Sequence, residues 1–178
     1  MGWDDTIRGS SSRRRPRRAG RAKSDAERRA LAKANAQPPR WTSDTARPGY
    51  ATLTVDGGAR QHPHTAAIGY VLLAADGSPL ASYAEAIGAA SAVVAEYRAL
   101  LTGLRHALEL GINPIAARSD SKLLVAHLKG ERTPRNRRLV TLGNELTDLI
   151  TRIGTVTVSW VPSEATGAAH ALVAEALE

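Results

Sequence analysis

Three carboxylates in the sequence have the residue types and the positions that metal-dependent hydrolysis requires. Asp56 and Asp120 each close a segment with strand character, and Glu96 lies in the second turn of a predicted helix, beside its apolar stripe. Sites in open α/β sheets form at the carboxyl ends of strands. Acids held together there repel one another unless cations bind between them, and oxygen ligands suit Mg²⁺ or Mn²⁺. Two such ions, roughly 3.5–4 Å apart, activate a water and stabilise the leaving oxygen in phosphodiester cleavage.

Each of these acids also has an ordinary structural explanation. Asp56 precedes Gly57-Gly58 and fits a turn, Asp120 fits a helix N-cap, and Glu96 fits a solvated helix face. Spacing alone therefore leaves a metal site and three unrelated surface acids both open.

Alternation and turn residues predict the elements that must position the acids. Asp76-Gly77 predicts a two-residue primed turn between two strands. A helix is predicted after a Ser91 cap and before Gly111, because apolar residues recur on one face at Val94, Tyr97, Leu101, Leu104 and Leu108. Strands are predicted at 51–56, 66–75, 79–87, 114–119 and 155–161, and helices at 91–110, 120–128, 136–153 and 166–177. A hairpin followed by alternating helices and strands predicts an α/β fold with a mixed sheet covered by helices.

The positive charge of the chain is concentrated at its start. Residues 1–49 carry a net charge of +8, whereas residues 50–178 carry a net charge of −1. We therefore expect a basic, largely disordered tail over 1–48 and a globular domain over 49–178. The tail is predicted to contact nucleic-acid phosphates through Arg13, Arg14, Arg15, Arg17 and Arg18, and the alternative is a tail that only solubilises the protein.

Composition excludes several classes of protein. The chain has no cysteine, so a disulfide scaffold, a cysteine-ligated zinc site and a thiol nucleophile are all excluded. The apolar runs are short, so we expect neither a transmembrane span nor a signal-peptide core. A soluble, cytoplasmic protein is the resulting expectation.

The words around the three acids, taken in order, resemble those of type 1 ribonuclease H. Thr54-Val55-Asp56-Gly57-Gly58-Ala59-Arg60 resembles the family's first strand, and Ala95-Glu96-Tyr97-Arg98-Ala99-Leu100-Leu101 its first long helix. Residues 119–125 resemble its Ser-Asp-Ser word, and residues 160–164 with 169–177 its last strand and helix. The resemblance implies a ribonuclease H-like fold, with a five-stranded mixed sheet flanked by helices. It also implies cleavage of the RNA strand of RNA–DNA hybrids, with 5′-phosphate and 3′-hydroxyl products.

The resemblance also implies roles for particular residues. Asp56 would bridge two metal ions, and Glu96 and Asp120 would hold the second of them. Contacts to the substrate are expected from Gly57, Gly58, Arg60, Ser121, Arg135, Arg137 and Arg138.

One departure from the family pattern affects the fourth metal ligand. The family's last helix usually supplies an acid, whereas this chain has His170 in the word Ala169-His170-Ala171-Leu172. An imidazole ligates Mn²⁺ more readily than Mg²⁺. Its place in the first turn after the predicted cap Thr166 favours the neutral, ligating form. The substitution therefore predicts a preference for Mn²⁺, and the alternative is that His170 is a surface residue without a role.

Other departures leave the substrate open. Ala92-Val93 replaces an Asn-Asn pair that often contacts nucleic acid near the cut, and His62 and His64 occupy the first loop as weak metal or phosphate candidates. Two alternatives remain besides a hybrid nuclease. One is a nuclease of the same fold acting on double-stranded RNA or branched DNA. The other is a catalytically impaired hybrid- or RNA-binding module, against which the three intact acids argue.

Overall fold

The computed structural model describes residues 47–61 and 64–178. Its elements are β1 (Ala51–Arg60), β2 (Thr65–Leu73), β3 (Pro79–Gly88), α2 (Ala92–Glu109), β4 (Ile115–Ser119), α3 (Lys122–Leu128), α4 (Arg137–Ile153), β5 (Val156–Trp160), η1 (Ser163–Thr166) and α5 (Gly167–Ala176). This is the predicted order of strands and helices, with the short 3-10 helix η1 added before α5. The predicted arginine-rich tail lies outside the described residues.

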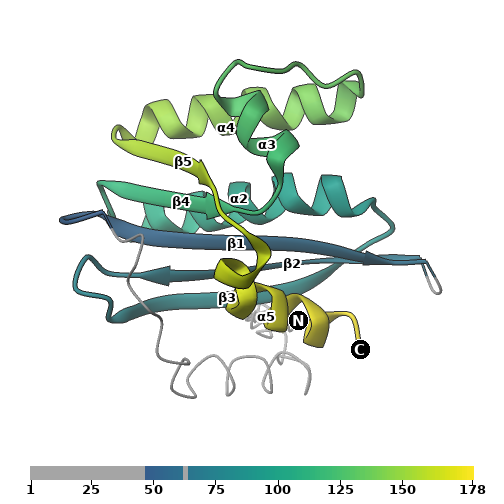
Figure 1. Ribbon diagram of the computed structural model, residues 1–178, viewed down its shortest axis with the longest axis horizontal. Helices are drawn as coiled ribbons and strands as arrows, with labels where there is room; N and C mark the ends of the chain where they lie inside the picture. The colour runs from purple at the N-terminus through teal and green to yellow at the C-terminus, as the bar shows by residue number, and fades with distance from the viewer. Residues whose placement is uncertain (1–46, 62–63) are drawn as a thin grey trace, which may run out of the picture.

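The five strands form one mixed sheet in the order β3-β2-β1-β4-β5. The strands β1, β2 and β3 pair antiparallel, whereas β4 lies parallel to both β1 and β5. In Figure 1, β1 runs through the middle of the sheet and α5 crosses the side opposite α2. The five-stranded mixed sheet flanked by helices is confirmed, and its central strand carries the first candidate acid.

The main core lies between the sheet and α2, with α4 packed on the far side of α2. Leu53 of β1 and Leu104 of α2 are fully buried in it. The Ser91 side chain caps α2 as predicted, because its oxygen accepts a hydrogen bond from the Val94 backbone N–H at 3.3 Å. Burying these apolar side chains supplies most of the driving force that holds α2 against β1.

Two histidines within helices pair with buried tyrosine hydroxyls. His106 Nδ1 lies 2.6 Å from the Tyr70 hydroxyl, and His127 Nδ1 lies 3.0 Å from the Tyr97 hydroxyl. Both tyrosine rings are buried, so each hydroxyl needs a partner inside the protein. Neither histidine belongs to the acid cluster.

The first strand is longer than its periodicity predicts. The sequence predicts a loop from Gly57, but β1 continues to Arg60 because β2 pairs with it as far as Arg60 opposite Thr65. Asp56 therefore lies inside a strand and not at its end. Its place at the site depends instead on where the neighbouring strand β4 stops.

The hairpin between β2 and β3 has a different turn from the one predicted. Only Gly77 has a positive φ, of 82°, whereas a primed two-residue turn of the Asn-Gly type requires positive φ at both central residues. Ala74 N–H donates to the Ser78 carbonyl at 2.8 Å, which closes a three-residue loop. The Asp76 carboxylate accepts a hydrogen bond from the Ser78 backbone N–H at 2.9 Å and stabilises this longer turn.

Two of the side chains considered as helix caps, those of Asp120 and Thr166, make no cap hydrogen bond. Asp120 precedes α3 by two residues, and Ser121 occupies the N-cap position without a side-chain hydrogen bond. Thr166 makes no side-chain cap for α5, because its hydroxyl is used elsewhere. At the start of α4 the structure adds a cap, because the Asn136 side chain accepts a hydrogen bond from the Arg138 N–H at 2.9 Å. Among the described residues, no helix has the length and apolar character needed to cross a bilayer.

Candidate active site

Asp56 lies on β1 just beyond the last residue that pairs with β4. The last pair between β1 and β4 joins Thr54 to Arg118, and β4 ends one residue later at Ser119. On its other edge, Asp56 stays paired with Gly69 of β2. The pairing with β2 therefore holds the Asp56 backbone, while its side chain lies in a group with those of Glu96 and Asp120.

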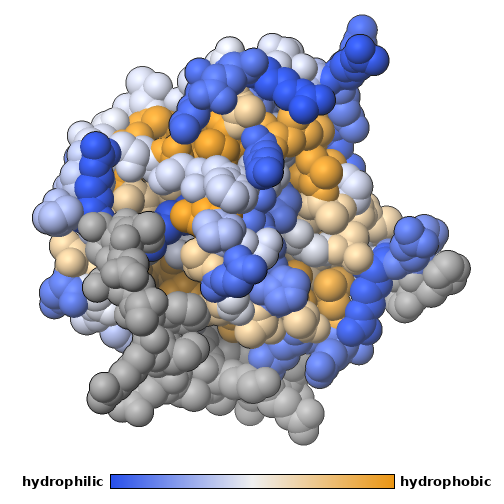
Figure 2. Space-filling model, viewed as in Figure 1, coloured by the Kyte–Doolittle hydropathy of each residue, from blue (hydrophilic) through white to orange (hydrophobic). Residues whose placement is uncertain are grey.

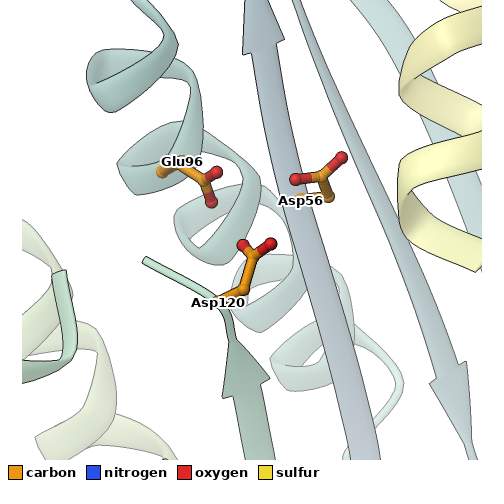
Figure 3. A group of neighbouring side chains, drawn as sticks. All are labelled: Asp56, Glu96 and Asp120. Atoms are coloured by element: carbon orange, nitrogen blue, oxygen red, sulfur yellow. The ribbon is translucent and has the colours of Figure 1, made fainter. Parts of the chain in front are cut away.

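Asp120 and Glu96 join this group from two other parts of the chain. Asp120 follows β4 directly, and Glu96 projects from the second turn of α2. Gly57 allows the approach of α2, because a Cβ added to it would lie only 2.3 Å from the Glu96 backbone nitrogen. Figure 3 shows the three carboxylates turned toward one another, from β1, from α2 and from the residue after β4.

The three acids form a compact group of oxygen ligands. One oxygen of each of Asp56, Glu96 and Asp120 lies within 4.8 Å of the others. Among the described residues, Glu96 Oε2 is the one buried side-chain oxygen or nitrogen atom without a hydrogen-bond partner. Leaving a buried acceptor unpaired costs free energy, and a cation among three carboxylates would remove that cost. These residues therefore fit a divalent metal such as Mg²⁺ or Mn²⁺.

The raised pKa values of Glu96 and Asp56 also indicate that this group of carboxyls would be stabilised by a bound cation. Burial raises the pKa of the Glu96 carboxyl to about 9, and the charges of Asp56 and Asp120 add to the rise. Burial also raises the pKa of Asp56, and Asp120 adds to this rise while the neighbouring His170 opposes it. Without a cation, Glu96 is thus held largely protonated at neutral pH, and a bound cation would reverse this by favouring the charged carboxylates.

His170 lies beside this group but outside it. The residue is in the first turn of α5, as predicted, and its Nδ1 lies 3.0 Å from Asp56 Oδ2. Its side chain is 72% exposed, whereas that of Asp56 is 7% exposed. The helix comes this close because Gly69 leaves room for it, since a Cβ there would lie 2.8 Å from the Ala169 carbonyl oxygen. His170 therefore contacts one candidate ligand, from the solvent side.

The residues predicted to contact substrate are spread over several parts of the structure. Gly57 and Gly58 have packing roles in β1, since a Cβ on Gly58 would lie 2.9 Å from Val173 of α5. Ser121 is half-buried next to Asp120, and Arg60 is exposed at the end of β1. The remaining three are exposed in the segment between α3 and α4 and in the first turn of α4: Arg135, Arg137 and Arg138. Figure 2 shows this segment as a hydrophilic stretch at the top of the molecule.

Other predicted residues lie away from the acids or outside the described chain. The tail arginines and His62 lie outside the described residues, and His64 is exposed at the start of β2. Ala92 and Val93 are the first two residues of α2, and both are exposed.

Sequence reasoning missed three residues that contact the acids. The Ser119 side chain hydrogen-bonds to Glu96 and is fully buried. The Trp160 indole N–H donates to the Asp120 carbonyl, and the Thr166 hydroxyl lies 3.4 Å from Asp120 Oδ2. The Ser119 contact joins elements 23 residues apart, and the other two join segments 40 and 46 residues apart, so no local pattern marks them. Ser119 stands out in the sequence only as part of the word around Asp120.

A five-stranded mixed sheet with converging acids on β1, on α2 and after β4 defines a protein of the ribonuclease H-like class. A family model described as reverse transcriptase-like matches residues 54–176, which is most of the described chain. Ribonuclease HI of Halobacterium salinarum is 33% identical over 123 residues, covering 69% of this chain and 62% of that protein. The chain belongs to the type 1 ribonuclease H family.

Solved structures agree with this assignment. The crystal structure of RNase H1 from Halobacterium salinarum superposes with a TM-score of 0.69 at 32% identity, covering 72% of this chain and 98% of that one. The N-terminal RNase H domain of Rv2228c from Mycobacterium tuberculosis superposes with a TM-score of 0.68 at 34% identity, covering 72% of this chain and 93% of that one. The alignment spans only 35% of the full-length mycobacterial protein, which is described as bifunctional.

Proposed function

We propose that this chain is a metal-dependent endonuclease that cleaves the RNA strand of RNA–DNA hybrids and leaves 5′-phosphate and 3′-hydroxyl ends. The observation that carries the proposal is the group of Asp56, Glu96 and Asp120, with its buried and unpaired Glu96 oxygen. A similar protein supports the substrate. The LC11-RNase H1 structure in complex with an RNA/DNA hybrid superposes with a TM-score of 0.67 at 26% identity, covering 71% of this chain and 96% of that one.

Each site residue has a distinct role in this proposal. Asp56, Glu96 and Asp120 would hold Mg²⁺ or Mn²⁺, with Asp56 shared between two ions. When bound, such ions activate a water and stabilise the leaving oxygen. Glu96 must lose its proton before it can serve as a ligand, because burial raises the pKa of its carboxyl to about 9. His170 holds Asp56 through its Nδ1 and stands where the family has a fourth acid.

A substrate panel with a matched variant tests the function. Labelled RNA–DNA hybrid, double-stranded RNA and branched DNA are incubated with the protein in Mg²⁺, in Mn²⁺ and in EDTA. We expect the protein to cleave the hybrid and not the other two substrates. Cleavage should require metal and should leave 5′-phosphate ends. In Asp120→Asn, which keeps nearly the same volume, we expect activity to fall more than about 100-fold, since even outer-shell partners of metals cost 10–100-fold.

Two results would contradict this assignment. If the protein prefers double-stranded RNA or branched DNA, the assigned substrate is wrong but the assignment as a nuclease stands. Hybrid binding without cleavage in either metal would favour the binding-module alternative. Circular dichroism of Asp120→Asn is the control that separates loss of a ligand from loss of fold.

The basic tail is proposed to add affinity for the nucleic-acid backbone without sequence preference. In the sequence, its arginines precede a domain of nearly neutral net charge. Deleting residues 1–48 should leave cleavage chemistry intact, because all three acids lie beyond the deletion. The deletion should weaken hybrid binding and flatten the slope of log K against log salt, by up to roughly one unit for each phosphate that the tail neutralises. An unchanged salt slope would show that the tail does not touch the substrate.

A further inference from the structure

Asp120 lies between two regular elements. Strand β4 ends at Ser119 and helix α3 begins at Lys122, so neither a strand ladder nor a helix holds the Asp120 backbone directly. A metal ligand in such a segment needs other groups to fix its direction, because outer-shell hydrogen bonds orient ligands and tune metal affinity. The connection from β5 to α5 crosses the sheet beside this segment and supplies such groups (Figure 1).

Trp160, at the end of β5, holds the main chain of Asp120. Its indole Nε1–H donates a hydrogen bond to the Asp120 carbonyl oxygen at 3.0 Å. The Lys122 ammonium lies 5.0 Å from the centre of the indole ring, which ties the start of α3 to the same side chain. Trp160 is 44% exposed, so its contribution to the buried core is limited. Its directed contacts go to the segment that carries Asp120.

The surrounding hydrogen bonds restrict the same segment. Val161 N–H donates to the Ser119 carbonyl at 3.0 Å, and Ser121 N–H donates to the Ser119 hydroxyl at 3.1 Å. Thr166 is almost fully buried, and its hydroxyl lies 3.0 Å from the Ser163 carbonyl and 3.4 Å from Asp120 Oδ2. The end of β5 thus reaches the carbonyl of Asp120, and the connection from β5 to α5 reaches its carboxylate.

We propose that Trp160 is a positioning residue that sets the direction of the Asp120 carboxylate toward the metal, with Thr166 as its weaker partner. The proposal rests on the proposed function, because it concerns how that metal site is held together. The Trp160 contact is the shorter of the two, so its removal should have the larger effect.

Metal binding to the full-length chain tests the proposal without an activity assay. The Mn²⁺ dissociation constant is measured by the electron paramagnetic resonance signal of free Mn²⁺, for the full chain and for Trp160→Phe. Phenylalanine keeps an aromatic ring but removes the N–H donor. We expect the dissociation constant to rise about tenfold in Trp160→Phe and less in Thr166→Val, which removes the hydroxyl at nearly constant volume.

Tyr83→Phe is the matched control, since it removes the donor of an exposed aromatic side chain on β3, whose hydroxyl lies 2.6 Å from Glu85. It should leave the Mn²⁺ affinity unchanged. In hybrid cleavage, Trp160→Phe should need more Mn²⁺ for half-maximal activity and should recover most of its kcat at saturating Mn²⁺. A change in thermal unfolding alone, without a change in Mn²⁺ affinity, would be the signature of a merely structural role.

The outcomes distinguish a failure of the positioning role from a failure of the proposed nuclease function. If the parent protein binds no Mn²⁺, the proposed function fails and the positioning role falls with it. If the parent binds Mn²⁺, while Trp160→Phe and Thr166→Val both bind it as tightly, the positioning role is overturned and the proposed function stands.

Discussion

The two halves of β1 pack in opposite ways. In the first half, large side chains fill the space to the helix, and Leu53 lies against Gly103 of α2. In the second half, glycines occupy the positions where α2 and α5 approach the strand. Gly57 meets the backbone of α2, and Gly58 meets Val173 of α5. The first half contributes buried apolar area, whereas the second half contributes short distances between backbones.

This difference explains why the acids meet on the second half. The backbone of α2 lies against β1 at Gly57, and this close approach brings the Glu96 carboxylate to Asp56. On the opposite face, α5 lies close to Gly69, and His170 reaches Asp56 from there. Large residues on the first half stabilise the fold by burying apolar side chains. The glycines on the second half allow the backbone of α2 and the side chains of α5 to come close to β1.

The strongest test of the comparison is Gly57→Ala. The added Cβ would lie 2.3 Å from the carbonyl carbon of Ala95 and from the nitrogen of Glu96, and these backbone atoms cannot rotate away. Helix α2 must move, so we expect a loss of at least about 3 kcal/mol in the free energy of unfolding. Hybrid cleavage should fall more than about 100-fold, because Glu96 moves with the helix. Urea unfolding and a cleavage assay measure the two effects. Parent-like values for both would show that β1 and α2 are not in close contact at this point.

Leu53→Ala probes the other half of the strand. The side chain is fully buried, so its truncation should cost about 2–5 kcal/mol in the free energy of unfolding. The Mn²⁺ dissociation constant of the folded protein should stay within about twofold of the parent, because the cavity lies away from the acids. Unfolding by urea and Mn²⁺ titration at low temperature provide the comparison. A large loss of metal affinity would remove the distinction between the two halves.

The pH dependence of stability tests the strain among the acids. The pKa of Glu96 is raised from 4.5 in the unfolded chain to about 9 in the folded protein. Between these values the folded state keeps a proton that the unfolded state has lost, so stability is fully present below about pH 4.5 and falls as pH rises toward 9. Urea unfolding in EDTA should show a loss of at least about 1 kcal/mol between about pH 5 and about pH 9.

Glu96→Gln is the control for that slope. Glutamine cannot ionise, so the variant should lose much of the pH dependence and should be more stable than the parent at about pH 9 in EDTA. Asp56 leaves a remaining slope in the same direction, because burial raises its pKa as well. An unchanged slope in Glu96→Gln would show that another group carries the pH effect.

The smallest effects are expected at His170, on the solvent side of the site. If its imidazole serves as a ligand, the parent should be more active with Mn²⁺ than with Mg²⁺. His170→Asp should then raise Mg²⁺-supported activity several-fold, and His170→Ala should lower Mn²⁺-supported activity without abolishing it. Parallel cleavage assays in the two metals, with circular dichroism as the fold control, measure these effects. Parent-like behaviour of both variants in both metals would make His170 a bystander.

Local patterns in the sequence determined most of the elements of this protein. Alternating apolar residues predicted the strands, and a helical apolar stripe after Ser91 predicted α2. The three acids were also predicted, because each lies in a sequence word that resembles one of the family's. Such patterns succeed because hydrogen bonds within a helix and side-chain alternation along a strand involve residues close together in the chain.

Tertiary structure alone decided the extent of β1, the turn at Gly77 and the partners of the acids. Strand β1 continues through Gly57 and Gly58 because β2 pairs with it, although glycines usually end a strand. Ser119, Trp160 and Thr166 reach the acids only when β4, β5 and α5 are folded together. The physical reason is that the pKa of Glu96 and the direction of Asp120 depend on burial and on contacts between distant segments, which no spacing within the chain records.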